Sequence, residues 1–395
     1  RRDVRHINPA CFPDRIAQMI DEVRPLRVLF KAAVLFFGVN ILFAWVNPPV
    51  GKLTLYNSLF PGRVRFSYEQ EPQFYLKGFN APIYEDFDAM FGAHRISQKK
   101  KDDEFRILFL GDSSTWSVSV QAEDTLAEQL NRKRLRVRDG RTIRVYNLGY
   151  PMSFLMRDLL ILDKAMEYEP DMIIWFITLS TLESKRAETY FILPHADRYL
   201  QLLETYSLPP LPLIEPIHAA AFFDRTIVGQ RRRLRNILFV QAMGALWAAT
   251  GVDNHEGRAN VTGVPDPNVE ANFEYGKMLP GDDLSEYFAL LRTDIISAAR
   301  AVAGDAPVVL INQPIFVAGG LNSDVRYNDL YPRWVYDEYR RFLSDWTDEH
   351  ELPYLDFWNA LPPADFADSM FHRNRNGEKE FADMLAPQLQ QLIRP

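Results

Sequence analysis

The feature that most constrains the fold is residues 105–114, which read Phe-Arg-Ile-Leu-Phe-Leu-Gly-Asp-Ser-Ser. The apolar run is typical of a strand buried on both faces, and it ends abruptly at Gly111. A strand, a tight glycine turn and then a helix lift a side chain off the edge of a sheet, which suits a serine nucleophile. Gly, Asp and Ser are also ordinary turn residues. The segment therefore indicates a nucleophile at Ser113 only if the chain also supplies a histidine, an acid and donors for an oxyanion.

A candidate histidine lies near the other end of the chain, where Asp368 and His372 are four residues apart. The helical spacing of Ala382, Leu385 and Leu389 predicts a helix just after them. A carboxylate this close in sequence can orient an imidazole, fix its tautomer and stabilise the imidazolium. Asp356, at the end of a predicted strand, is an alternative partner for the same histidine.

Strand and helix patterns alternate from residue 104 onward. The predicted strands are 106–110, 143–148, 172–179, 308–312 and 354–357, with helices near 125–135, 155–166 and 334–346. Such alternation implies a parallel sheet with helices on both faces. Sites in these sheets lie beyond the carboxyl ends of the strands, where Ser113, Gly149, Ser180 and His372 all fall.

With these elements in place, the chain resembles the SGNH (GDSL-type) hydrolase family over about residues 104–182 and 305–395. The first block of that family matches Gly111-Asp112-Ser113, and the last block matches residues 368–377, with Asp-x-x-x-His in place of the commoner Asp-x-x-His. Residues 146–151 and 170–179 are similar to the two middle blocks. The resemblance implies a three-layer, flavodoxin-like α/β domain with Ser113 as nucleophile, His372 as general base and Asp368 as its orienter.

The oxyanion donors depart from the pattern of the family. The family usually has a second glycine a few residues after the asparagine of its second block, and the matching position here is Met152. Residues 178–181, Thr-Leu-Ser-Thr, stand where the family has Gly-x-Asn-Asp. A backbone N–H survives replacement of glycine, and Ser180 or Thr181 can donate a hydroxyl. We therefore expect the N–H of Ser113, the N–H of Gly149 or Met152, and the side chain of Ser180 to hold an oxyanion. Loss of one such donor typically lowers turnover by about a hundredfold or more.

Residues 28–46 form a nearly uninterrupted apolar run, long enough to cross a bilayer core of about 30 Å. Lys31 lies near its start and can reach the interface, and Trp45 lies at the other interface. Six arginines and four acids precede the run, so the positive-inside rule predicts a cytoplasmic N-terminus and an extracytoplasmic main domain. The alternatives are a buried helix of a soluble domain or a signal peptide, and the length of the run and its late start argue against the latter.

The predicted organisation is a cytoplasmic segment 1–27, a transmembrane helix 28–46, a juxtamembrane segment 47–103 and an SGNH-like domain 104–395 with an insertion at about 183–304. Within the insertion, residues 236–252 follow Arg231-Arg232-Arg233-Leu234-Arg235. They are either an interfacial or capping helix, which would let a lipid-borne substrate reach the site, or a core helix of the insertion. A second span is rejected because it would separate His372 from Ser113.

Composition excludes several classes of function. The 395 residues are 47% hydrophobic and carry a net charge of -7, with no long basic block, so no nucleic-acid partner is expected. Cys11 is the only cysteine, and no zinc-spaced histidines or phosphate loop occur, so we expect neither a metal nor a cofactor. His195 and His218 stand near prolines, without a partner histidine or acid at a useful spacing, and are predicted to be surface or structural residues. The aromatic segment 327–334 either lines a substrate cleft or covers the sheet.

Two functions are compatible with these observations. The first is a membrane-anchored serine esterase or O-acyltransferase that acts on cell-envelope glycans or lipids. One anchor with such a domain also resembles proteins that work with membrane-bound O-acyltransferases, so the expected partners are the bilayer and such an acyltransferase or another membrane complex. The second is a catalytically degenerate domain that serves as an accessory subunit, which the altered oxyanion residues favour.

Overall fold

The structure is a computed structural model that describes residues 24–53, 62–66, 86–152, 154–183, 189–211, 216–250, 284–320 and 322–393. Residues 1–23 of the predicted cytoplasmic segment, most of 54–85 and all of 251–283 lie outside the described residues. Internal contacts divide the chain into two units. One consists of the N-terminal residues up to Pro48 with Ala220–Arg232, and the other is a larger unit that contains the sheet.

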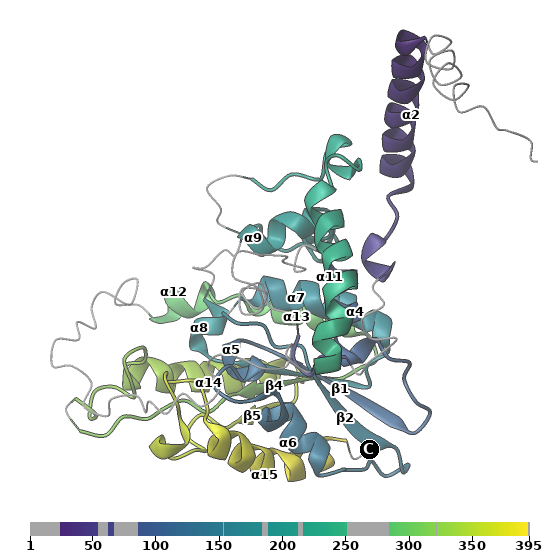
Figure 1. Ribbon diagram of the computed structural model, residues 1–395. Helices are drawn as coiled ribbons and strands as arrows, with labels where there is room; N and C mark the ends of the chain where they lie inside the picture. Colours follow the sequence, from purple (N-terminus) through teal and green to yellow (C-terminus); the bar gives the residue numbers. More distant parts are fainter. Residues whose placement is uncertain are drawn as a thin grey trace, which may run out of the picture. The chain divides into compact units, whose positions relative to one another are not determined.

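The larger unit is built on a five-stranded, wholly parallel sheet with the strand order β2-β1-β3-β4-β5 (Figure 1). The strands are β1 (Glu104–Leu110), β2 (Thr142–Asn147), β3 (Met172–Ile177), β4 (Val308–Asn312) and β5 (Tyr354–Asp356). All five predicted strands are present, and the order is that of flavodoxin-like sheets. In this order the connections reverse direction between β1 and β3, and ligands bind at that point.

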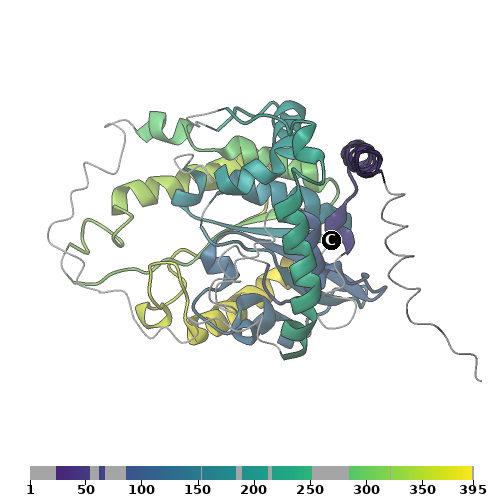
Figure 2. The ribbon, with the colours of Figure 1, turned by 45° about the horizontal axis from the view of Figure 1, so that its top comes forward.

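Helices cover both faces of the sheet, which confirms the predicted three-layer α/β fold (Figure 2). Alternate side chains of a parallel strand point to opposite faces. Leu108 and Leu110 of β1 accordingly pack in one core with α7, α13 and α14, whereas Ile107 and Phe109 pack in the other with α6 and α15. These helices are α6 (Leu126–Arg132), α7 (Leu155–Ala165), α13 (Thr293–Ala303), α14 (Arg333–Glu349) and α15 (Arg375–Leu392).

Further helices fill the connections. They are α4 (Phe87–Ala93), α5 (Ser113–Trp116), α8 (Leu179–Leu182), α9 (Thr189–Ile192), α10 (Ala196–Tyr206), α11 (Arg231–Thr250) and α12 (Leu284–Ala289). The predicted third strand is two residues too long, because the chain turns after Ile177 into α8 through a capping box between Thr178 and Thr181. The helix predicted over 236–252 is observed as α11, which begins five residues earlier; residues 251 and 252 lie outside the described residues.

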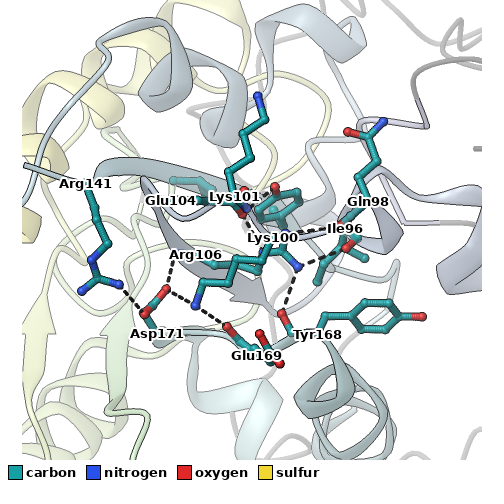
Figure 3. A network of polar contacts seen from close by, with 12 residues as sticks. Ile96, Gln98, Lys100, Lys101, Glu104, Arg106, Arg141, Tyr168, Glu169 and Asp171 are labelled. Carbon is teal, nitrogen blue, oxygen red and sulfur yellow. Dashed lines mark hydrogen bonds and ion pairs between the residues drawn. The ribbon is translucent and has the colours of Figure 1, made fainter.

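A buried ionic network fixes the amino-terminal edge of β1 (Figure 3). Arg106 donates to Glu104 Oε1 at 2.6 Å and to the carbonyl oxygens of Ile96, Gln98 and Tyr168. Asp171, just before β3, accepts from the Arg106 N–H at 2.6 Å. Because both charges of the Arg106–Glu104 pair are almost fully buried, these extra hydrogen bonds offset their loss of hydration. The network lies at the edge of the sheet opposite Ser113.

The smaller unit contains α2 (Pro25–Val46), which begins three residues earlier than the predicted span. Pro25 occupies the first turn, where a missing N–H breaks no helical hydrogen bond. Only 11% of the apolar 18-residue window of α2 is buried inside the protein. Within the described ranges, α2 is the single helix that is both long and apolar enough to cross a membrane.

Candidate active site

The turn after β1 presents Ser113 at the start of α5. Gly111 has a φ of +145°, and a Cβ there would lie 2.3 Å from Thr115 Oγ1, so only glycine fits this turn. Asp112 caps α5 by accepting from the Ser114 N–H at 2.9 Å, and its second oxygen accepts from Gln313 Nε2 at 3.0 Å. Gln313 directly follows β4 and is fully buried. The end of β4 therefore helps to hold the turn that carries Ser113.

The loop before α15 presents His372. Its ends are joined by a bridge between Phe366 and Arg373 and by a hydrogen bond from Ala367 N to His372 O. Ser369 Oγ accepts from the N–H of His372 at 3.2 Å, which folds the loop back on itself. Asn374 then caps α15 through the N–H groups of the first helical turn. Local hydrogen bonds therefore fix the position of the imidazole.

The two loops bring three side chains into one hydrogen-bonded chain. Ser113 Oγ lies 2.8 Å from His372 Nε2, and His372 Nδ1 lies 2.8 Å from Asp368 Oδ1. Ser119 Oγ also donates to Asp368 Oδ1 at 3.0 Å. A charged Asp368 can only accept, so Nδ1 carries the proton and Nε2 is left to accept from the serine. The hydrogen bond from His372 lowers the pKa of Asp368 to about 2, against the opposing effect of partial burial.

Asp356, the alternative acid, is engaged elsewhere. Its Oδ1 accepts from Asn312 Nδ2 at 2.9 Å, and its Oδ2 accepts from Arg340 at 2.7 Å. Asp368 rather than Asp356 therefore contacts the histidine, and Asp356 joins β5 to β4 and α14.

The Gly149 N–H is already used by a neighbouring side chain. It donates to Asn147 Oδ1 at 3.0 Å. A Cβ at Gly149 would lie 2.7 Å from the Trp116 N atom, so this glycine permits close packing of the turn after β2 against α5. Of the two backbone donors that the sequence left open, Met152 is the one without an internal acceptor among the described residues.

Met152 has a φ of +75°, a conformation that favours glycine. The turn is held by Arg157, which donates to the carbonyl oxygens of Pro151 at 3.0 Å and Met152 at 2.7 Å. The β1–β2 pairing extends to a hydrogen bond from Tyr150 N to Gly111 O, two residues before Met152. The methionine thus has a left-handed backbone at the position where the sequence resemblance expects a glycine.

We predict that Met152→Gly stabilises the protein by up to about 1 kcal/mol. The substitution removes left-handed strain of about 1–2 kcal/mol, and the greater entropy of glycine in the unfolded chain offsets part of this gain. The side chain is 44% exposed, so little packing is lost. Urea unfolding measures the effect. Met152→Ala, which keeps a Cβ, is the matched control and should bring no gain.

Ser180 lies in a cluster of hydroxyl groups at the end of β3. Its Oγ is 3.0 Å from Thr178 Oγ1 and 3.0 Å from the Tyr331 hydroxyl, which also accepts from the Ser180 N–H. Burial raises the pKa of Tyr331 to about 12, so its hydroxyl is a neutral donor. Tyr331 also packs edge-on against Phe371, beside His372. The aromatic segment 327–334 therefore reaches the candidate site through this tyrosine.

Arg373 links the serine turn to the histidine loop, and sequence reasoning missed it. Its guanidinium donates to Ser114 Oγ at 2.7 Å, to Ser114 O at 2.9 Å and to Glu378 Oε2 at 3.1 Å. Both side chains of the Arg373–Glu378 pair are fully buried. Burial raises the pKa of Glu378, and the charge of Arg373 opposes that shift. Adjacency to His372 was the only signal in the sequence.

Arg373→Met is expected to lower the free energy of unfolding by about 3–5 kcal/mol, because it leaves Glu378 buried without its cation. The double variant Arg373→Met/Glu378→Leu should recover most of this loss, since replacing both members of a buried pair by apolar groups is often neutral. Chemical unfolding of the purified protein measures both. A loss below about 1 kcal/mol in the single variant would contradict the assigned role.

The two other histidines considered from the sequence, His195 and His218, lie in a packed and in an exposed environment, respectively. His195 stacks on Phe87 with ring centroids 3.7 Å apart, and His218 is exposed. Across the residues described by the structure, no group of three or more His, Cys, Asp or Glu side chains is placed to hold a metal ion.

Comparison with known proteins gives fold-level likenesses only. No protein family matches the chain, and no curated protein does. The structure is similar to a protein of the G-D-S-L family from Desulfitobacterium hafniense DCB-2, at 11% identity over 72% of this chain and 98% of that one, with a TM-score of 0.31. It is also similar to the aryl esterase of M. smegmatis, at 11% identity over 73% and 99%, with a TM-score of 0.32. A mutant acetylxylan esterase of Geobacillus stearothermophilus matches at 15% identity over 73% and 93%, with a TM-score of 0.34. At these identities, the function must be argued from the residues of this chain.

Proposed function

We propose that this chain is a membrane-anchored serine esterase or O-acyltransferase that acts on acyl esters of cell-envelope glycans or lipids. The observation that carries the proposal is the continuous hydrogen-bonded chain from Ser113 through His372 to Asp368, with both links at 2.8 Å. A nucleophile in contact with a base that is itself oriented by an acid is the arrangement that activates a serine hydroxyl.

The proposed reaction has two halves. Ser113 Oγ attacks the carbonyl carbon of the acyl ester while His372 Nε2 takes the hydroxyl proton. The tetrahedral oxyanion accepts hydrogen bonds from the N–H groups of Ser113 and Met152 and from the Ser180 hydroxyl. His372 then protonates the departing alcohol, which leaves an acyl-serine. In the second half, water or a sugar hydroxyl loses a proton to His372 and attacks the acyl carbonyl carbon. The bond to Ser113 Oγ then breaks, and His372 returns the proton to that oxygen.

The membrane part of the proposal rests on α2. Its 22 residues span about 33 Å at 1.5 Å per residue, which matches a bilayer core of about 30 Å. Large apolar side chains on it are strongly exposed, including Leu35 at 67% and Phe37 at 62%. Such exposure is unfavourable in water and expected in lipid. The proposed orientation has the N-terminus in the cytoplasm and the sheet domain outside.

A fluorophosphonate probe tests whether Ser113 is activated. The purified full-length protein should be labelled once, at Ser113, and the label is located by peptide mass spectrometry. An unlabelled protein would instead support the second candidate, an accessory subunit without activity. The altered residues Met152 and Thr178–Thr181 are the observations that favour this alternative. Acyl transfer from an activated ester to an oligosaccharide, measured against hydrolysis, then distinguishes a sugar acceptor from water.

Ser180→Ala should lower kcat about a hundredfold with little change in KM, because the Ser180 hydroxyl is proposed to bind charge that develops only in the transition state. Ser180→Thr, which keeps a hydroxyl, is the matched control and should retain most of the activity. Steady-state hydrolysis of a p-nitrophenyl ester measures both variants. Equal activity of Ser180→Ala and wild type would exclude Ser180 as an oxyanion donor.

A further inference from the structure

The smaller unit contains a compact turn, residues 220–232, that packs on the C-terminal third of α2; we call it the anchor turn. We propose that the anchor turn is a second membrane contact, which lies in the outer interface of a lipid bilayer beside α2 and places Phe222 and Phe223 among the acyl chains. This inference rests on the proposed membrane anchoring of α2 and is independent of the proposed chemistry at Ser113.

Asn40 supplies the first argument. An amide within a membrane-spanning helix is unfavourable unless its polar atoms are satisfied. Asn40 is 7% exposed, donates to Phe36 O at 2.9 Å and accepts from the Val228 N–H at 3.2 Å. Gln230 Nε2 reaches Asn47 Oδ1, at the end of the same helix, at 3.4 Å. The polar residues of α2 therefore hold the anchor turn in place.

The backbone of the anchor turn supplies the second argument. In lipid, backbone polar groups must be satisfied within the protein. Internal hydrogen bonds satisfy most of the N–H groups here, namely those of Ala221, Asp224, Arg225, Thr226, Val228, Gly229, Gln230 and Arg231. An exposed loop in water has no need of so complete a set. The short helix Phe223–Arg225 and the side chains of Thr226 and Asp224 make this possible.

The exposed side chains indicate how deep the anchor turn lies in the bilayer. Phe222 and Phe223 are 56% and 62% exposed, although neighbouring polar groups are well bonded. Asp224 is exposed beside them, and exposed arginines follow at Arg231 and Arg232. Aromatic side chains next to charged ones are typical of segments that lie at the boundary between headgroups and acyl chains. The arginines are then placed to contact lipid phosphates.

The position along α2 agrees with this depth. Asn40 precedes Val46 by six residues, so it lies about 9 Å from the helix end. Interfacial segments are buried by about 5–10 Å. The Val228 contact with Asn40 thus places the anchor turn at the boundary and keeps it out of the bilayer centre, where Asp224 would be strongly unfavourable.

The depth of a spin label tests the inference in the full chain. Cys11 is the only cysteine, so Cys11→Ser gives a clean background for single labels. Phe223→Cys is the test position. Phe37→Cys, 62% exposed on α2, is the lipid reference, and Leu290→Cys, 65% exposed in the sheet unit, is the water reference. Each protein is placed in nanodiscs of phosphatidylcholine and phosphatidylglycerol, and collision rates with oxygen and with a water-soluble nickel complex are measured.

The inference predicts that the oxygen-to-nickel collision ratio at Phe223→Cys is severalfold above that at Leu290→Cys and below that at Phe37→Cys. A ratio equal to that at Leu290→Cys would overturn the proposed lipid contact of the anchor turn. The same result is expected if Phe223 is covered by a partner protein and not by lipid. A water-like ratio at Phe37→Cys would overturn the anchoring of α2 as well. None of these readouts depends on Ser113, so a failure of this inference can be told apart from a failure of the proposed chemistry at Ser113.

Discussion

Ser113→Ala is expected to abolish labelling by a fluorophosphonate probe and to lower ester hydrolysis by about 10³–10⁴-fold or more. The hydroxyl supplies the attacking atom, and His372 Nε2 has no other proton to accept at its 2.8 Å contact. Residual activity over water would come from the oxyanion donors and substrate binding alone. Hydrolysis of a p-nitrophenyl ester and intact-protein mass spectrometry after labelling measure the two effects.

Ser297→Ala provides a matched serine control, because Ser297 is exposed on α13 and donates only to the Thr293 carbonyl. It should be labelled and active like the wild type. Circular dichroism should show that both variants are folded. Undiminished hydrolysis or labelling in Ser113→Ala would exclude the proposed nucleophile and leave the accessory role as the better account of the domain.

Asp368→Asn is expected to lower kcat by about 10³–10⁴-fold at neutral pH. An amide NH₂ facing His372 Nδ1 favours the tautomer that carries its proton on Nε2, and that tautomer cannot accept the Ser113 proton. The matched control is Asp356→Asn, the same change at the other candidate acid, which bonds Asn312 and Arg340 and makes no contact with the histidine. Equal losses in the two variants would indicate a general effect on folding rather than loss of the orienting acid.

The same substitution should change the dependence of stability on pH. The pKa of Asp368 is lowered from 3.8 to about 2 in the folded protein, so its ionised form stabilises the fold. This contribution is complete above about pH 4 and is lost as the pH falls toward 2. The difference in unfolding free energy between wild type and Asp368→Asn should therefore stay constant from pH 7 to 5 and shrink on further acidification. Urea unfolding at several pH values measures it, and a difference that grows on acidification would contradict the assignment.

Much of the fold could be predicted because its signals are local. Buried parallel strands are continuous apolar runs, so the five strands were found within one or two residues of their ends. The apolar run that begins at Val28 was found in the same way, and only its start was placed too late. The end of β3 was missed because Thr178 and Thr181 form a capping box that starts a helix, which competes with the apolar pattern of residues 172–179.

The sequence pointed to the three hydrogen-bonded side chains of the candidate site, but much less to the residues that support them. Ser113, Asp368 and His372 follow recognisable turn and loop patterns. Arg373 and Tyr331 carry no such pattern, because an arginine beside a loop or a tyrosine in an aromatic segment usually serves the surface or the core. Their roles depend on reaching Ser114 and Ser180 across the fold.

The sequence alone determined the strand–turn–helix unit at Ser113, the Asp368–His372 pair and the apolar span, since each depends on residues that are neighbours along the chain. Only the tertiary structure decided that Asp368 rather than Asp356 contacts the histidine, that the Gly149 N–H is already bonded, and that Met152 adopts a left-handed backbone. The physical reason is distance along the chain. Ser113 and His372 are 259 positions apart, and only the packing of the intervening strands and helices brings their atoms within a hydrogen bond.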